Sequence, residues 1–282
     1  MAKDDYEQKK YQTAEEYLAR RYEIQEEKPD IPMKDEAFVA AWDHEPEMAA
    51  LDFLAARFSL PVERFMWRNP KAVSLTTADS MAGRLPVVRT SDHRDFCNMT
   101  ALLNGLESAP EYPLTVNAFT MQARAKSIRR HRLLLLNNAP YSYIPSQRLG
   151  LDEGEWLERS HRLRLRHECV HYETLRLFGE MKNHALDEIA ADALGQIAAF
   201  GRFDADRQRL FFGLERGKDT CTGRLSFYCQ NVLPEERGRI YLAVDEALEG
   251  IKAEINELQA AGAETFMLLR VLLGRSIRER IS

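Results

Sequence analysis

His167, Glu168 and His171 are the residues whose types and spacing are best suited to chemistry. Positions i and i+4 of an α-helix lie one turn apart on the same face, so the two histidines can direct both imidazole rings at one point. Two imidazoles held in this way are half of the ligand set of a tetrahedral zinc ion. Glu168 would then lie beside the ion without ligating it, where a carboxylate can take a proton from a coordinated water.

The residues around this motif predict the helices that must position it. Apolar residues and the two histidines recur at intervals of three and four over 156–178, which is typical of an amphipathic helix with the histidines on its inward face. Gly179 is suited to end this helix, and Asn183 to cap a second one. Glu188 and Asp192, again four residues apart, share one stripe of the second helix. We therefore expect a helix hairpin that turns this stripe toward the histidines.

The two motifs together, HExxH at 167–171 and ExxxD at 188–192, resemble the gluzincin branch of the zinc peptidases, the thermolysin-like clan. The resemblance covers about 26 residues, from the first motif to the end of the second. It assigns roles to five residues: the metal ligands His167, His171 and Glu188, the general base Glu168, and Asp192, which accepts a hydrogen bond from a histidine ring. Three protein ligands leave the fourth position of zinc open to water, as in catalytic sites. The resemblance therefore implies a catalytic zinc centre.

Other interpretations of the same residues stay open. Histidines on an apolar helix face are often core residues whose ring nitrogens bond to neighbouring groups. Glu168 and His171 also match half of a ferritin-like di-iron site, but Glu180 and His184, the nearest second pair, are one residue too far apart. His184 and Asp187 are alternative third ligands. A metal that only holds helices together, without catalysis, is a further alternative.

The composition excludes several classes of protein. Hydrophobic residues make up 45% of the chain and charged residues 29%, as in globular proteins that are soluble in water. A net charge of −5 gives no electrostatic case for binding nucleic acid. The first ten residues lack the apolar core of a signal peptide, and no apolar run approaches the roughly 20 residues of a membrane span. We therefore expect a cytoplasmic protein that binds neither nucleic acid nor a membrane.

The cysteines favour the same compartment. Cys97, Cys169, Cys221 and Cys229 show neither CxxC spacing nor the pattern of a disulfide framework, so we expect reduced thiols. Cys169 lies inside the histidine motif. Because each helical residue is rotated by about 100° from the one before, its side chain points away from both histidines. We expect it to pack in the core and not to bind metal.

The predicted fold class is mainly α (α+β), with a zincin-like helix pair, a small β-sheet and helical regions at both ends. Residues 1–112 predict a helical and irregular N-terminal region, and 113–282 a zinc domain with a C-terminal helical lobe, although one continuous domain is equally compatible. Extended segments at 114–121 and 133–137 would form the sheet. In the resembled clan an edge strand pairs with the substrate backbone, and Asn117–Phe119 is the segment we expect at that edge.

Shorter signals predict further helices. A capping box at 13–16 opens one helix, and a second covers 48–58. A long amphipathic helix follows Pro234, ends near 261–262, and is followed by a last helix. This C-terminal pair can cap the zinc domain, as helical lobes do in the resembled clan, or it can form a homodimer interface.

Basic and aromatic residues near the motif also have two interpretations. The run of Arg162, Arg164 and Arg166 is first of all a solvated helix face with partners such as Glu158, and its functional interpretation is capture of a substrate carboxylate or phosphate. Zinc peptidases often use a tyrosine to donate a hydrogen bond to the tetrahedral intermediate. The chain offers four candidates: Tyr141, Tyr143, Tyr172 and Tyr228. Tyrosines are more often packing residues, and the sequence does not choose among the four.

Together these observations predict a zinc-dependent hydrolase that cleaves a peptide or amide bond in a peptide or protein substrate. Glu168 would activate a zinc-bound water and then deliver the proton to the leaving nitrogen. The alternative is a non-catalytic module, in which zinc stabilises two helices and the helical lobes bind a partner protein.

Overall fold

The computed structural model describes residues 9–24 and 29–281. Residues 1–8, which carry most of the argument against a signal peptide, lie outside the described residues. The described residues divide into two compact units, one formed by 30–173 and the other by 9–24, 29 and 174–281. The boundary expected near residue 112 falls within the first of these units, and the division of the sequence into 1–112 and 113–282 stays a prediction.

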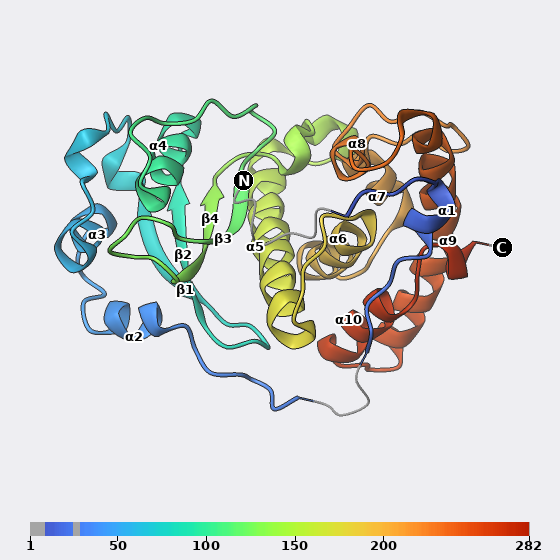
Figure 1. Cartoon of the computed structure of the whole chain (residues 1–282), viewed down its shortest axis with the longest axis horizontal. Coiled ribbons are helices and arrows are strands. Elements are labelled where there is room, and N and C mark those ends of the chain that lie inside the picture. Colours follow the sequence, from blue (N-terminus) through green and yellow to red (C-terminus); the bar gives the residue numbers. More distant parts are fainter. Residues whose placement is uncertain (1–8, 25–28, 282) are drawn as a thin grey trace. The chain divides into compact units, whose positions relative to one another are not determined.

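The fold is mainly α (α+β), as expected, with helices at both ends of the chain and one small mixed sheet (Figure 1). The sheet has the order β1-β2-β4-β3, with β1 at Ser74–Ala78, β2 at Leu85–Thr90, β3 at Ala118–Gln122 and β4 at Arg132–Asn137. Strand β2 is antiparallel to β1 and parallel to β4, and β3 is antiparallel to β4. None of the helices formed by the described residues combines the length and apolar character needed to cross a lipid bilayer.

Strands β1 and β2 were not predicted by the sequence analysis. Strands β3 and β4 lie where extended segments were expected, but β1 and β2 fall in a region expected to be only helical and irregular. Both missed strands are short, and Pro86 interrupts the apolar pattern of β2. Their partners are each other and β4, about 45 residues further along the chain. The pairing of β2 with β4 depends on long-range contacts that local periodicity does not reveal, whereas β1 pairs with β2 across the short connection 79–84.

The two faces of the sheet pack against different helices. Helix α4, His93–Asn104, lies against β2 and β4. Alternate side chains of a strand point to opposite faces, so Leu133 and Leu135 join the core that contains α4. Leu134 and Leu136 join a separate cluster with Cys169 and Tyr172 of α5, Glu153–Phe178. The sheet is therefore buried on both faces, and its second face positions the helix with the histidines.

Two more helices complete this unit. Helix α2, Ala37–Asp43, and helix α3, Ala50–Phe58, contribute Phe38 and Phe53 to the core on the α4 side of the sheet. The expected helix at 48–58 is confirmed, with its start two residues later at Ala50.

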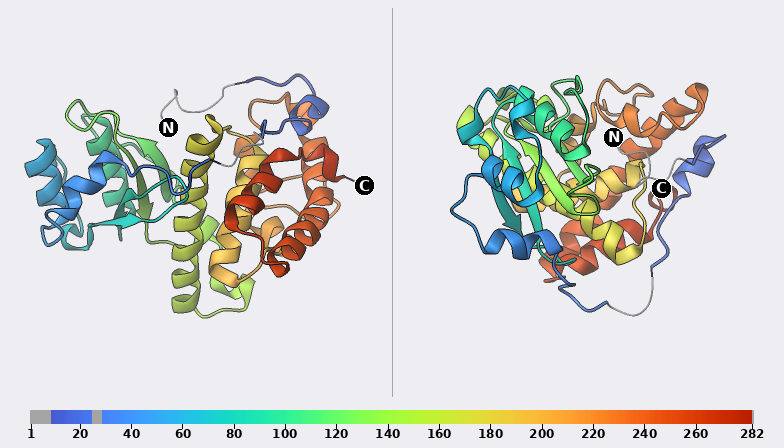
Figure 2. Two further views of the ribbon diagram at one scale, coloured as in Figure 1. Left: turned by 90° about the horizontal axis from the view of Figure 1, so that it is seen from below. Right: turned by 60° about the vertical axis from the view of Figure 1, so that its left-hand side comes forward.

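The other unit is helical. It contains α1 at Ala14–Leu18, α6 at Ala185–Phe200, α7 at Ala205–Phe212, α8 at Leu225–Tyr228, α9 at Arg237–Ala260 and α10 at Thr265–Gly274. Helix α10 packs against α6 and α9, and α1 and α7 also pack against α9. The left view of Figure 2 shows the dark blue segment that contains α1 beside orange and red helices of this unit. The N–H of Ala14 donates to Glu236 Oε2 at 2.8 Å and ties the N-terminal segment to the start of α9.

The ends of these helices agree closely with the sequence analysis. Gly179, with φ of 77°, follows the end of α5 as expected. The cap of α6 is His184 and not Asn183, because the Nδ1 atom of His184 accepts a hydrogen bond from the Leu186 N–H at 3.0 Å. The expected cap at Thr13 and the break after α9, where Gly262 has φ of 80°, are both confirmed.

The apolar stripe of α9 is used within its own unit. Ile240, Val244, Leu248 and Ile251 on this stripe are fully buried in the chain. A homodimer formed through the C-terminal helices stays a prediction, and it would have to use other side chains of α9 and α10.

Leucine 134 offers a test of how strongly the sheet holds α5. It is fully buried between the sheet and α5, so we expect Leu134→Ala to lower the free energy of unfolding by about 2–5 kcal/mol. Leu114→Ala is the matched control, because Leu114 is 53% exposed and its truncation should change stability by less than about 0.5 kcal/mol. Urea denaturation followed by circular dichroism measures both, and equal effects of the two substitutions would contradict this packing.

Candidate metal centre

His167 and His171 lie one turn apart on α5 and are both buried. Their Nε2 atoms are 3.0 Å apart. Two zinc–nitrogen bonds of about 2.0–2.1 Å at a tetrahedral angle would hold the nitrogens about 3.3 Å apart. The pair therefore has nearly the separation that a shared zinc ion requires.

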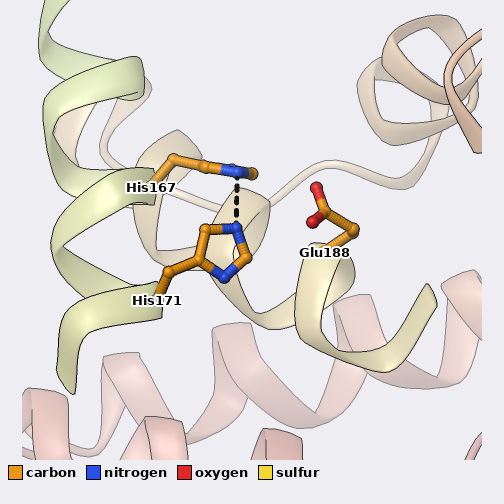
Figure 3. Close-up of side chains that lie close together, drawn as sticks. All are labelled: His167, His171 and Glu188. Carbon is orange, nitrogen blue, oxygen red and sulfur yellow. Dashed lines mark hydrogen bonds between the residues drawn. The ribbon is translucent and has the colours of Figure 1, made fainter. Parts of the chain in front are cut away.

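Glu188 of α6 is the third member of the group. The ligand atoms of His167, His171 and Glu188 all lie within 4.8 Å of one another (Figure 3). Two imidazole nitrogens and one carboxylate oxygen are the protein ligands of many catalytic zinc sites. All three side chains are less than a tenth exposed, so that without a bound cation the Glu188 carboxylate would be buried at a cost in solvation energy. The donor set and its burial thus fit a zinc ion.

The two alternative third ligands are engaged elsewhere. His184 stacks on the ring of Tyr17 with the ring centres 3.8 Å apart, and its Nε2 atom lies 3.0 Å from the Tyr17 carbonyl oxygen. Burial lowers the pKa of His184 to about 3, so the ring is neutral. Asp187 accepts hydrogen bonds from the Tyr22 hydroxyl and from the Lys182 N–H. Both residues connect the start of α6 to neighbouring segments, and neither belongs to the metal-binding group.

Tyr141 orients the first histidine. Its hydroxyl lies 2.9 Å from the Nδ1 atom of His167, which leaves Nε2 for a metal. Hydrogen bonds to the second ring nitrogen are the usual way of fixing the tautomer and orientation of a ligating histidine. The Tyr141 N–H in turn donates to Ser160 Oγ of α5 at 2.9 Å, which anchors the tyrosine to the same helix. Sequence analysis included Tyr141 only as a donor to a reaction intermediate, because nothing local in the sequence relates it to His167.

Arg224, at the start of α8, contacts both carboxylates of the second motif. Its Nη1 atom donates to Glu188 Oε2 at 3.1 Å, and Nη2 donates to Asp192 Oδ2. The side-chain amide of Gln208 also donates to Asp192 Oδ2, at 2.6 Å. The arginine thus donates to Oε2, one of the two carboxylate oxygens of Glu188. Sequence analysis missed Arg224, since no periodicity links it to a glutamate 36 residues earlier.

Tyr228 lies beside the same carboxylates. Burial, followed by the negative charge of Glu188, raises the pKa of the Tyr228 hydroxyl well above its usual value, so it is a proton donor at every physiological pH. A hydrogen bond between the Tyr228 and Glu188 side chains raises the same pKa further. The role of Asp192 as acceptor for a histidine ring stays a prediction.

Glu168 is buried beside the histidines and is held by the sheet. The hydroxyl of Thr120, on β3, lies 2.7 Å from Glu168 Oε2 and 2.8 Å from the Glu168 carbonyl oxygen. A hydroxyl carries one proton, so it donates to one of these oxygens at a time. The contact connects the edge strand to the residue expected to act as general base.

The basic run before the motif serves the fold. Arg162 forms the expected exposed ion pair with Glu158. Arg164, in contrast, is buried and donates to the carbonyl oxygens of residues 137, 139 and 140, and burial lowers its pKa to about 10. Arg166 forms a two-pronged pair with buried Glu173 at 2.8 and 2.7 Å. The expectation of a solvated face is therefore correct for Arg162 and wrong for the other two arginines.

The remaining tyrosines and cysteines fit structural roles. The Tyr172 hydroxyl donates to Glu36 Oε1 at 2.9 Å, and Tyr143 is 52% exposed. The four cysteines are free thiols, as expected. Cys169 packs against the sheet, as expected, and burial raises the pKa of its thiol to about 12.

Removal of the Tyr141 hydroxyl tests its role. We expect Tyr141→Phe to weaken zinc binding by about 10- to 100-fold, because His167 loses the hydrogen bond that orients it. Tyr143→Phe, two residues away and exposed, is the control and should leave the affinity unchanged. Competition with a chromophoric chelator gives the zinc affinity, and equal affinities for both variants and the wild type would argue against the orienting contact.

Comparison with known proteins gives one result. No curated protein and no solved structure matches the chain. A family model, described as a family of unknown function (DUF7005), matches residues 115–273. This segment spans more than half of the 282 residues and contains both motifs. The chain therefore belongs to the DUF7005 family.

Proposed function

We propose that this protein is a zinc-dependent hydrolase that cleaves a peptide or amide bond, with a peptide or protein as its substrate. The observation that carries the proposal is the convergence of His167, His171 and Glu188 within 4.8 Å. When bound to these ligands, zinc polarises a carbonyl group and lowers the pKa of water toward about 7. Glu168 follows the first ligand directly and supplies the carboxylate that such chemistry needs.

Glu168 acts as the proton carrier. Thr120 engages its Oε2 atom, so we assign Oε1 to the attacking water. This oxygen takes the proton as the water attacks and delivers it to the leaving nitrogen. The Thr120 hydrogen bond limits rotation of the carboxylate and keeps this oxygen in place.

The edge of the sheet supports a peptide as the substrate. Strand β3 is the last strand in the order β1-β2-β4-β3, and it contains Ala118 and Phe119 of the expected edge segment. An extended peptide can add to such an edge through main-chain hydrogen bonds. Thr120 belongs to the same strand and contacts Glu168, so a peptide aligned along β3 would run past the proton carrier.

A non-catalytic zinc site is the second candidate. The observation in its favour is the burial of the ligands, since His167, His171 and Glu188 are 4%, 6% and 5% exposed. Structural zinc sites are closed to water, whereas catalytic sites keep one open position. Zinc binding with a large loss of thermal stability on chelation, and without hydrolysis of any peptide, would favour this candidate.

Metal content is the first test. We expect about one zinc per chain in the wild type, as the donor set of one tetrahedral site implies, and a sharp reduction in Glu188→Ala. Glu215→Ala, which removes an exposed glutamate, is the control and should keep its zinc. Elemental analysis after gel filtration measures all three proteins. Zinc that is absent from the wild type, or indifferent to Glu188, would overturn the proposed site.

Turnover is the second test. Glu168→Gln keeps the size of the side chain but cannot accept a proton, so we expect zinc to remain bound and hydrolysis to fall by at least about 100-fold. Glu158→Gln, on an exposed face of the same helix, is the matched control. A library of quenched fluorescent peptides supplies the assay. Full activity of Glu168→Gln would contradict the assigned base.

A further inference from the structure

A cationic cavity lies at the end of the parallel strand pair. Strands β2 and β4 run parallel, so their carboxyl ends, Thr90 and Asn137, meet at the same edge of the sheet. A cavity of about 250 Å³ opens there, with walls from both strand ends, from the segment before β1 and from His161 of α5. Crevices at the carboxyl ends of parallel strands are frequent ligand sites.

The cavity is charged because of one residue in the strand pattern. Leu85 and Val87 of β2 face α5 in the apolar cluster with Tyr172. Side chains alternate along a strand, so Arg89 continues this row on the α5 side of the sheet. Where the next apolar residue would be expected, the row ends in a guanidinium group that lines the cavity beside His161.

Arg89 lacks the partner that a half-buried charge usually has. Within residues 9–24 and 29–281, no carboxylate pairs with its guanidinium, and its buried Nε atom makes no hydrogen bond. Burial alone lowers its pKa. The pKa of His161 is also lowered, by burial and then by the positive charges of Arg89 and Arg164. Two basic side chains, Arg89 and His161, thus line this space, and a buried charge without a partner is costly.

We propose that this cavity binds a compact anion through a carboxylate or phosphate group, with Arg89 as the principal contact and His161 as a second donor. A guanidinium presents paired N–H donors that match the oxygens of either group. Ser74 and Asn138 line the cavity and add a hydroxyl and an amide. The hydroxyl of Ser91, which accepts from Asn69 at 3.0 Å, keeps its own proton for a ligand.

The size of the cavity limits the ligand. A volume of about 250 Å³ lies below the roughly 300–1,000 Å³ of pockets for drug-sized molecules, so the ligand is a small anion or the anionic end of a larger molecule. His161 and the first metal ligand, His167, are six residues apart on α5, or about 9 Å along the helix axis. The proposal is independent of zinc binding and of hydrolysis.

Anion titration tests the proposal directly. The wild type is titrated with inorganic phosphate and, separately, with succinate by isothermal titration calorimetry. We expect at least one of the two anions to bind. Which of them binds distinguishes a phosphate ligand from a carboxylate ligand. Arg89→Gln should weaken this binding by at least about tenfold, because a hydrogen bond to a charged group contributes more than one factor of ten. Arg148→Gln, which removes an exposed arginine, is the matched control and should bind as the wild type does.

Two further measurements keep the result interpretable. Arg89→Gln should unfold at the same temperature as the wild type or higher without anion, because it removes a half-buried charge that lacks a carboxylate partner. His171→Ala, which removes a candidate zinc ligand, should retain anion binding. The proposal is overturned if neither anion binds at about 10 mM, if Arg89→Gln binds as tightly as the wild type, or if binding is lost with His171 and not with Arg89.

Discussion

The packing of α5 on the sheet is the interaction on which the rest of the arrangement depends. Cys169 and Tyr172 face Leu134 and Leu136 of β4, and this contact fixes the rotation of the helix about its own axis. Each residue is rotated by about 100° from the one before it, so fixing these two side chains also fixes the direction of His167, His171 and Glu168. A rotation by one residue would bring polar side chains into the apolar layer and move both histidines out of register. The apolar layer therefore positions the candidate site without being part of it.

Buried polar contacts add precision to this packing. Arg164 donates to the carbonyl oxygens of Ala139 and Pro140, directly before Tyr141. The segment that it holds presents the Tyr141 hydroxyl to His167. Arg166 and the Met81 N–H both donate to the fully buried Glu173, which ties the same helix to the loop before β2. Removal of one partner from such a network leaves a buried polar group without a hydrogen bond. The main effect of these contacts is therefore to fix the position of α5, and their net contribution to stability is smaller.

Much of the site could be predicted from sequence because its spacing is local. Helical periodicity predicts that His167 and His171 lie on one face of their helix, and that Glu188 and Asp192 lie on one face of the next. Both helices formed where the apolar pattern placed them. The groups that position these residues could not be predicted, because they arrive from distant parts of the chain. Tyr141, Thr120 and Arg224 each precede or follow their partner by 26 to 48 residues. Strand β2, and with it Arg89, was missed for the same reason, since its partner β4 comes about 45 residues later.

The charges around α6 bear on the proposed binding of a cation. Arg224 donates to Glu188 and to Asp192, so one positive charge is shared by two carboxylates that are both nearly inaccessible to water. Burial of unbalanced negative charge is unfavourable, and a protein can relieve it by protonation or by binding a positive ion. In the proposed zinc centre, a divalent cation bound by Glu188 and both histidines would reduce this excess of negative charge. In the proposed centre, Arg224 would also hold the Asp192 carboxylate through its second nitrogen and keep it from competing with Glu188 for the metal.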